Sequence, residues 1–218
     1  MIAKELISSE VFPLKPTSTG DDALQMMNDF HVRHLPIVRD EQIIGLLAEE
    51  QIWNFDPDDA VETYALAPPQ YARENDHIYE VMRQINQHKL TLVPVVSLEN
   101  KYLGVITLYD LLQFFAKSAA FAEHGAVIVL EVNRQNYSLS QIARIVESEN
   151  AFVLNSFVTS APDTTELEVT LKISRPDIQR ILATFVRFGY IVKASFTEED
   201  YINDLKENYD MLLNYLSI

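Results

Sequence analysis

The stretch His34-Leu35-Pro36-Ile37-Val38 decides the fold, because a second stretch of the same kind, Val93-Pro94-Val95-Val96, follows it in the chain. Pro36 and Pro94 align at an offset of 58 residues. Two further blocks keep this register once a single inserted residue is allowed, and they pair Ala23–Met27 with Val81–Ile85 and Ile44–Leu47 with Leu103–Ile106. Three blocks in one register indicate an internal repeat, which fixes the architecture before any residue is given a role.

Each repeat has the same predicted order of elements: a helix, a short apolar strand that contains proline, a polar turn, a second strand and another helix. In the first repeat we expect helices at 21–30 and 49–54 around strands at 35–38 and 43–47. In the second repeat we expect helices at 78–87 and 109–122 around strands at 92–96 and 102–106. One repeat alone is too small to bury both faces of its sheet, so the two should pack together as a pseudo-symmetric pair.

These blocks, together with Gly104-Val105-Ile106-Thr107-Leu108-Tyr109-Asp110-Leu111-Leu112, resemble a tandem pair of CBS domains, the regulatory module named after cystathionine β-synthase. The resemblance covers residues 7–120. It implies a compact α/β module with a cleft between the repeats that often binds adenosine derivatives. We therefore expect residues 1–122 to form a CBS pair, with repeats at about 7–60 and 64–122.

The spacing Gly104-x-x-Thr107-x-x-Asp110 falls where a strand ends and a helix begins. A carboxylate at this point can accept hydrogen bonds from both hydroxyls of a ribose, and its charge strengthens each bond. The helix N-terminus also offers backbone amides to a phosphate. Alternatively, Thr107 or Asp110 only caps the helix. The resemblance favours ligand binding, because this Thr and Asp contact the ribose in CBS domains.

Other residues near this motif are candidates for the rest of a nucleotide site. Phosphate groups need cations, and the nearby candidates are Arg33, His34, Arg73 and Lys89, each of which could instead be a solvated surface charge. An adenine ring needs apolar walls, and the candidates are Ala72, Leu92, Val93 and Pro94, which could equally be plain core. The ligands that the resemblance implies are AMP, ADP, ATP or S-adenosylmethionine.

The first repeat departs from the motif, since Ala48 stands in the place of Thr107 and Gln51 in the place of Asp110. Glu49 next to Ala48 would also repel phosphates. We expect this half-site to be weak or empty, which leaves at most one good nucleotide site in the pair.

Composition excludes several classes of protein. Five glycines in 218 residues leave no window for the clustered glycines of a dinucleotide-binding turn or a P-loop, and the absence of cysteine removes disulfides, thiolate metal sites and a cysteine nucleophile. The net charge of −15 disfavours nucleic acid and anionic membranes as partners. No nucleophile turn, metal-ligand set or long apolar run stands out. We expect a cytoplasmic protein without enzymatic activity, membrane span or metal.

The second half has a different pattern of elements. Strands are expected at 126–132, 152–160, 166–173 and 190–196, with helices at 138–148 and 177–188. This order, βαββαβ, is the ferredoxin-like plan, so the whole chain is predicted to be of α/β (α+β) class. The order and the phrase Glu131–Ala143 resemble an ACT domain at about 125–197. ACT domains that bind amino acids carry glycine where this chain has Tyr137, so Asn133, Asn136 and Tyr137 are only candidate contacts for a ligand.

The tail, 198–218, repeats apolar residues at helical spacing and predicts an amphipathic helix that packs on its own chain or on a partner. A CBS pair followed by an ACT-like domain resembles the small regulatory proteins of acetoin utilisation. This resemblance implies a homodimeric sensor of adenine nucleotides that signals through its ACT-like half to an unidentified regulated protein. Two other readings stay open, a ligand-free dimeric scaffold and an amino-acid sensor that acts through the ACT-like domain.

Overall fold

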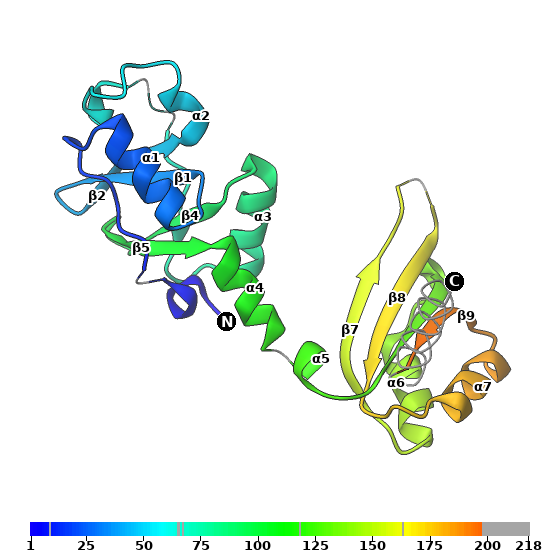
Figure 1. Ribbon diagram of the computed structural model, residues 1–218. Coiled ribbons are helices and arrows are strands. Elements are labelled where there is room, and N and C mark those ends of the chain that lie inside the picture. The colour runs from blue at the N-terminus through cyan, green and yellow to red at the C-terminus, as the bar shows by residue number, and fades with distance from the viewer. Residues whose placement is uncertain (9, 65, 67, 118, 163, 198–218) are drawn as a thin grey trace, which may run out of the picture. The chain divides into compact units, whose positions relative to one another are not determined.

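The computed structural model describes residues 1–197 except 9, 65, 67, 118 and 163 (Figure 1). The amphipathic helix predicted at 198–218 lies outside the described residues. The chain divides into two compact units, residues 1–115 and 116–218, and each is described by itself.

The first unit contains two similar halves, as the internal repeat predicts. The first half consists of α1 (Gly20–Asp29), β1 (His34–Arg39), β2 (Gln42–Ala48) and α2 (Glu49–Ile52). The second half consists of β3 (Ala72–Arg73), α3 (Ile78–His88), β4 (Leu92–Val96), β5 (Tyr102–Thr107) and α4 (Leu108–Ala116). Two short 3-10 helices, η1 (Ala3–Leu6) and η2 (Val61–Thr63), precede the halves. No local pattern in the sequence predicts β3, η1 or η2, because these short segments depend on contacts with distant residues.

The two hairpins share their geometry. β1 pairs with β2 in antiparallel fashion, and β4 pairs with β5 in the same way. Each hairpin has an irregularity at the equivalent place, between Ile37 and Val38 in the first and between Val95 and Val96 in the second. Asp40 and the residue after it link β1 to β2 with positive φ angles, which matches the twist of a tight hairpin.

A glycine in each hairpin accepts a side chain from the segment that precedes the other half. A methyl group on Gly45 would collide with the side chain of Leu66, and one on Gly104 would collide with that of Ile7. Ser8 also pairs with Val105 of β5. Ile7, from the segment before the first half, therefore packs on the hairpin of the second half. Leu66, from the segment before the second half, packs on the hairpin of the first half.

One apolar core joins the two halves. Leu35, Ile37 and Leu47 from the first half and Leu92 and Ile106 from the second are all fully buried in it. This confirms the expectation that the two repeats pack together, since neither sheet would otherwise cover its apolar face.

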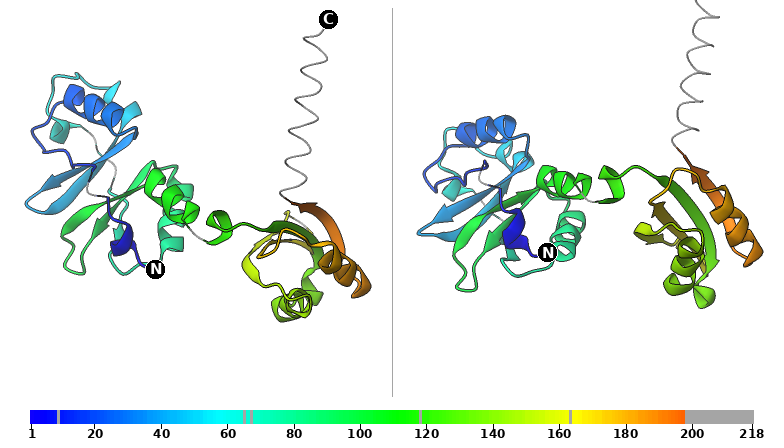
Figure 2. Two further views of the ribbon diagram at one scale, coloured as in Figure 1. Left: turned by 60° about the horizontal axis from the view of Figure 1, so that its bottom comes forward. Right: turned by 90° about the horizontal axis from the view of Figure 1, so that it is seen from below.

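The second unit is an antiparallel sheet with two helices on one face (Figure 2). Its elements are α5 (Ala119–Ala122), β6 (Ala126–Asn133), η3 (Arg134–Asn136), α6 (Leu139–Ser148), β7 (Val153–Thr159), β8 (Glu166–Ile173), α7 (Gln179–Arg187) and β9 (Ile191–Phe196). The strands lie in the order β7-β8-β6-β9. From β6 onward, the strands and the α-helices follow one another in the predicted order. β8 alternates as expected, with Leu167, Val169, Leu171 and Ile173 buried under the helices.

The helix predicted at 109–122 is interrupted. α4 ends at Ala116 and α5 is a separate short helix. Leu111 of α4 is buried, whereas Tyr109 and Leu112 are exposed. Helices gain most of their stability by packing an apolar face against other elements. Much of the apolar surface of α4 is instead exposed. Within the described part of the chain, no helix is long and apolar enough to cross a membrane.

Candidate functional site

Thr107 and Asp110 meet where β5 ends and α4 begins. The backbone N–H of Thr107 donates to Oδ2 of Asp110 at 2.8 Å, and its hydroxyl donates to the same oxygen at 2.6 Å. The N–H of Asp110 donates back to the Thr107 hydroxyl oxygen at 3.1 Å. This reciprocal pair is a capping box, so the capping role that the sequence suggested as an alternative is present.

The same pair also opens on a cavity of about 350 Å³, which we call the Thr107 cavity. Four segments of the first unit line it: the N-terminal stretch, the end of α1 with the residues after it, the turn before β4, and the junction of β5 with α4. Its lining residues are Ser8, Glu10, Val11, Asp29, Phe30, His31, Val32, Thr91, Thr107, Leu108, Tyr109 and Asp110. Capping thus does not remove Asp110 from the cavity, because the carboxylate has a second oxygen.

A second cavity, of about 360 Å³, lies at the equivalent place in the repeat, and we call it the Ala48 cavity. It is lined by Arg33, His34, Ala48, Glu49, Glu50, His88 and Lys89. The correspondence extends to the backbone, since His31 in the Thr107 cavity has a φ of 53° and Lys89 in the Ala48 cavity has a φ of 52°. The two cavities are therefore the two pseudo-equivalent sites of one repeat pair.

Arg33 and His34, which the sequence assigned to the phosphates of the Thr107 site, line the Ala48 cavity instead. The reason is the repeat itself: Arg33 corresponds to Thr91 at the offset of 58, and Thr91 lines the Thr107 cavity while Arg33 lines the Ala48 cavity. Nε of Arg33 lies 3.6 Å from Oε2 of Glu49, so its charge is already partly neutralised there.

His34 joins the two halves through Thr91. Nδ1 of His34 accepts the Thr91 N–H at 3.3 Å and lies 3.1 Å from the Thr91 hydroxyl oxygen. The hydroxyl also accepts the N–H of Arg33 at 2.9 Å. Burial lowers the pKa of His34, although the nearby Glu50 acts in the opposite direction. A neutral imidazole fits this arrangement, because a protonated Nδ1 could not accept the Thr91 N–H.

The remaining predicted contacts line neither cavity. Ala72 and Val93 are completely buried in the core, and Pro94 is buried in β4 opposite Val105. Arg73 is exposed on β3. Leu92, the fourth apolar candidate, is also completely buried. Of the alternatives that the sequence left open, the structure therefore favours plain core for all four apolar candidates and a solvated charge for Arg73.

Sequence reasoning missed several residues that do line the Thr107 cavity. Glu10 comes from the N-terminal stretch, and Asp29 and His31 come from the end of α1. Tyr109 was quoted within the motif but was not assigned a contact. The only signal for Asp29 and His31 is the repeat, which places the end of each first helix beside the other half's strand-to-helix junction.

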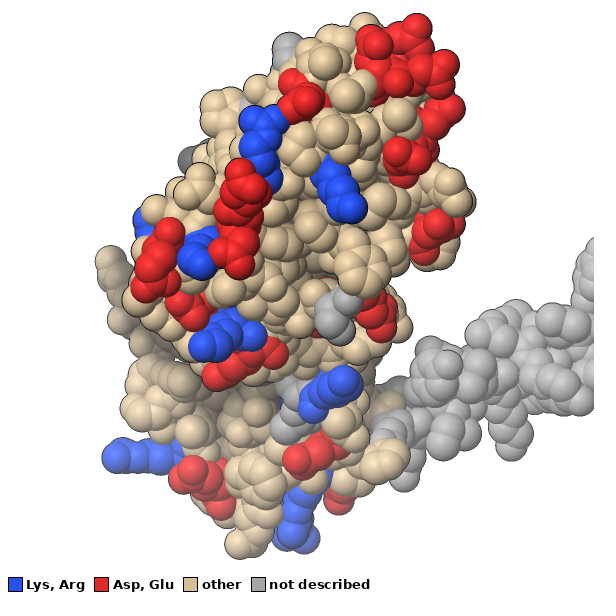
Figure 3. Space-filling view, turned by 90° about the vertical axis from the view of Figure 1, so that its left-hand side faces the viewer, with Lys and Arg blue, Asp and Glu red and all other residues tan. Residues whose placement is uncertain are grey.

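The acidic composition is visible on the surface. On the face drawn in Figure 3, acidic side chains gather at the upper right, and most basic side chains lie beside acidic ones. Among the described residues, no group of three or more His, Asp or Glu side chains is placed to hold a metal ion. His31 and His34, the one closely spaced histidine pair, belong to different cavities.

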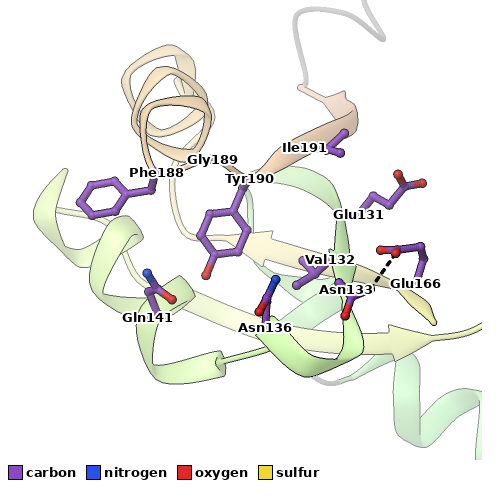
Figure 4. Close-up of a pocket in the computed structure, with 10 residues that line it drawn as sticks. All are labelled: Glu131, Val132, Asn133, Asn136, Gln141, Glu166, Phe188, Gly189, Tyr190 and Ile191. Atoms are coloured by element: carbon purple, nitrogen blue, oxygen red, sulfur yellow. Dashed lines mark hydrogen bonds between the residues drawn. The ribbon is translucent and has the colours of Figure 1, made fainter.

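The second unit has a larger cavity, of about 760 Å³, which we call the Tyr190 cavity (Figure 4). It lies between the end of β6, the start of α6 and the turn from α7 into β9. Its lining residues are Glu131, Val132, Asn133, Asn136, Gln141, Glu166, Phe188, Gly189, Tyr190 and Ile191. Two of the three predicted contacts, Asn133 and Asn136, are among them. Tyr137 is not, since its ring packs against the core of the unit.

Tyr190 provides an unused polar group in this cavity. Figure 4 shows its hydroxyl between Asn136 and Gln141. The hydroxyl oxygen is buried without a hydrogen-bond partner among the described residues, and burial raises the pKa of Tyr190. Asn133 is already engaged, because its Nδ2 donates to Glu166 at 2.9 Å. Buried hydroxyls are usually paired, so this one marks a place where a ligand or water can bind.

Known proteins resemble the first unit. The profile of the CBS domain family matches residues 3–52 and 61–117. Inosine-5′-monophosphate dehydrogenase of Methanocaldococcus jannaschii is 24% identical over 113 residues, which are 51% of this chain and 23% of that protein, so the chain spans less than a quarter of this curated relative.

Among solved structures, a CBS domain pair/ACT domain protein of Thermotoga maritima is 20% identical with a TM-score of 0.49, over 54% of this chain and 98% of that one. CBSX2, solved in complex with AMP, is 17% identical with a TM-score of 0.46, over 53% of this chain and 96% of that one. The family match and the repeat geometry agree, and the chain carries a pair of CBS domains, at residues 3–52 and 61–117.

Proposed function

We propose that this chain is a non-enzymatic regulator that senses an adenosine derivative in the Thr107 cavity. CBSX2 was solved with AMP, which shows that a CBS pair can hold this class of ligand. The observation that carries the proposal for this chain is the placement of Asp110. Its carboxylate lies at a helix N-terminus and lines a cavity built from both halves of the pair.

The chemistry of this corner suits a ribose. Oδ2 of Asp110 is held by two hydrogen bonds from Thr107, which fixes the orientation of the carboxylate. Oδ1 has no hydrogen-bond partner among the described residues and can accept from a ribose hydroxyl. Phe30 and Tyr109 provide aromatic surface for a base in the same cavity.

A sensor must also transmit the binding of its ligand, and the second unit is the candidate for this role. We propose that it is an ACT-like domain, which its βαββαβ order supports. A ligand that binds one arrangement of the chain better than another would shift the population toward it. Homodimer formation, an unidentified regulated protein and kinship with acetoin-utilisation regulators belong to the same proposal.

Calorimetric titration of the full chain with AMP, ADP, ATP and S-adenosylmethionine tests ligand binding. We expect at least one saturable ligand, and we expect Asp110→Asn to weaken it about tenfold or more, because hydrogen bonds to a charged group contribute ~1.5–3 kcal/mol. The matched control is Gln51→Ala, which alters the equivalent position in the other half and should leave this binding unchanged.

Silence with all four ligands would contradict the proposal and leave the ligand-free scaffold as the better reading. Binding that Asp110→Asn does not change would place the ligand outside the Thr107 cavity. Thermal melts of both variants show whether any loss of binding reflects a loss of folding.

The Tyr190 cavity favours a second candidate function, amino-acid binding by the second unit. Glu131 and Glu166 can hold an ammonium group, and the amides of Asn136 and Gln141 with the free hydroxyl of Tyr190 can hold a carboxylate. The cavity is within the size range of small-molecule sites.

The twenty common amino acids, screened by thermal shift and confirmed by calorimetry, test this second function. We expect Tyr190→Phe to weaken any binding and Tyr137→Phe to leave it unchanged, because Tyr137 does not line the cavity. No shift with any amino acid would remove this candidate.

A further inference from the structure

The Thr107 cavity is acidic, and this feature distinguishes among adenosine derivatives. Three of its lining residues carry carboxylates: Glu10, Asp29 and Asp110. Neither Lys nor Arg is among the described residues that line it. The basic residues that the sequence offered for phosphates, Arg33 and Lys89, lie in the Ala48 cavity.

We propose that the Thr107 cavity selects a positively charged adenosine derivative over adenine nucleotides that carry phosphates. The proposal rests on the proposed function, since it assumes that adenosine binds at Asp110. It adds the charge class of the ligand, which the family likeness leaves open.

Apart from His31, the described residues that line the cavity carry no basic side chain. Glu10 and Asp29 form no ion pair with a described Lys or Arg, and Asp29 lies at the C-terminal end of α1, where the helix dipole is also negative. A sphere of the cavity's volume, about 350 Å³, would be about 9 Å across, close to the Debye length of ~8 Å at physiological ionic strength. Any charged group of a bound ligand is therefore within range of all three carboxylates.

The helix N-terminus does not compensate, because its amides are already used. The N–H of Thr107 donates to Asp110, and the N–H of Asp110 donates to the Thr107 hydroxyl. The N–H of Leu108 donates to the carbonyl oxygen of Thr91 at 3.1 Å. A free helix N-terminus binds phosphate well, but here the capping box and Thr91 occupy three of its donors.

A cationic substituent, in contrast, finds favourable groups in the cavity. The carboxylates of Glu10 and Asp29 attract it, and the rings of Phe30 and Tyr109 can hold a sulfonium or ammonium group against their faces. The carboxylates of Glu10 and Asp29, which oppose a phosphate chain, thus favour a positive charge.

Calorimetry of the full chain with two matched ligand pairs tests the inference. S-adenosylmethionine and S-adenosylhomocysteine differ by a methyl group and the positive charge on sulfur, whereas AMP and adenosine differ by a phosphate. We expect S-adenosylmethionine to bind at least about tenfold tighter than S-adenosylhomocysteine, and AMP to bind weaker than adenosine. Raising the salt concentration should narrow both differences. Only binding that Asp110→Asn weakens is counted.

Variants that remove single carboxylates test whether the Thr107 cavity itself causes the preference for a positive charge. Glu10→Gln and Asp29→Asn should each narrow the ratio between S-adenosylmethionine and S-adenosylhomocysteine about threefold. Glu50→Gln, which removes a carboxylate from the Ala48 cavity, is the control and should leave the ratio unchanged.

The outcomes separate the inference from the proposed function. If AMP or ATP binds tighter than adenosine and Asp110→Asn weakens that binding, the adenosine site stands and its preference for a cation is wrong. If no adenosine derivative binds at Asp110, both fail. A ratio that Glu10→Gln and Asp29→Asn do not change would also overturn the inference.

Discussion

The hydroxyl of Thr107 donates to Oδ2 of Asp110 at 2.6 Å, and the N–H of Asp110 donates back to that hydroxyl oxygen. One pair of side chains therefore caps α4 and presents a carboxylate to the cavity. Stability and ligand binding share Asp110, so a variant at this position changes both.

Asp110→Ala should lower the free energy of unfolding by ~1 kcal/mol, because it removes the acceptor for two hydrogen bonds at the start of α4. Asp110→Asn keeps an oxygen acceptor and should cost less. Urea denaturation of the three proteins measures the difference. Equal stability of Asp110→Ala and the wild type would mean that the cap contributes nothing to α4.

Gly45 contacts Leu66 so closely that a methyl group has no room. Gly45→Ala should destabilise the protein by about 1–3 kcal/mol, the usual cost of overpacking. Adding Leu66→Ala should restore most of that loss, since it removes the side chain in the way. A double-mutant cycle by urea denaturation measures the coupling, and purely additive effects would contradict this contact.

Gly104 provides the comparison on the other side of the pseudo-symmetric pair. Its methyl would collide with Ile7, and its φ is 150°, a conformation that side-chain-bearing residues rarely adopt. Gly104→Ala should therefore cost more than Gly45→Ala, and Ile7→Ala should rescue it only in part because the backbone strain remains.

These contacts show which parts of the fold the sequence could reveal. The hairpins at β1–β2 and β4–β5 were predictable, because the spacing of Pro36 and Pro94 and the apolar residues around them are local signals. The exchange of Ile7 and Leu66 was not, since it joins residues far apart in the sequence and leaves only two glycines as a trace. β3 was not predictable for the same reason, because its two residues form a strand only by pairing with β4.

Tyr102 carries a buried hydroxyl that has no hydrogen-bond partner among the described residues. Tyr102→Phe should keep or raise the free energy of unfolding by up to ~1 kcal/mol near neutral pH, because a buried unpaired hydroxyl is unfavourable. Tyr79→Phe, at an exposed ring, is the control and should have no effect. A clear loss of stability in Tyr102→Phe would show that the hydroxyl is bound by water.

Alkaline pH gives a second measurement on the same residue. Burial raises the pKa of Tyr102 from 10.0 to about 12. Between these values the unfolded chain releases the phenol proton and the folded chain keeps it, so stability should fall as pH rises. Tyr102→Phe should remove that part of the fall. The free energy of unfolding is measured by urea denaturation between pH 8 and about 11. An equal fall of this free energy in Tyr102→Phe and the wild type would contradict the raised pKa.

The candidate site was only half predictable. Thr107 and Asp110 were found because the motif places them on one strand-to-helix turn. Arg33 and His34 were assigned to the wrong cavity, because proximity in sequence does not tell which of two pseudo-equivalent cavities a residue faces. The acidic lining was missed for a similar reason, since Glu10 and Asp29 reach the cavity only through the packing of the two halves.

His34 should make the first unit sensitive to mild acid. Burial lowers its pKa below the ordinary value of 6.5, and Nδ1 accepts the Thr91 N–H, so the folded state favours the neutral ring. As pH falls below about 6.5, the unfolded chain takes up a proton that the folded chain refuses, and stability is lost until the lower folded pKa is reached. His34→Asn offers an uncharged acceptor to Thr91 and should lose less free energy of unfolding as the pH falls.

Urea denaturation of the wild type and His34→Asn at pH 7.5 and 5.5 measures this loss. Because the acidic groups are common to both proteins, the difference between their losses isolates His34. If the two proteins lose the same free energy of unfolding between these pH values, protonation of His34 does not oppose folding.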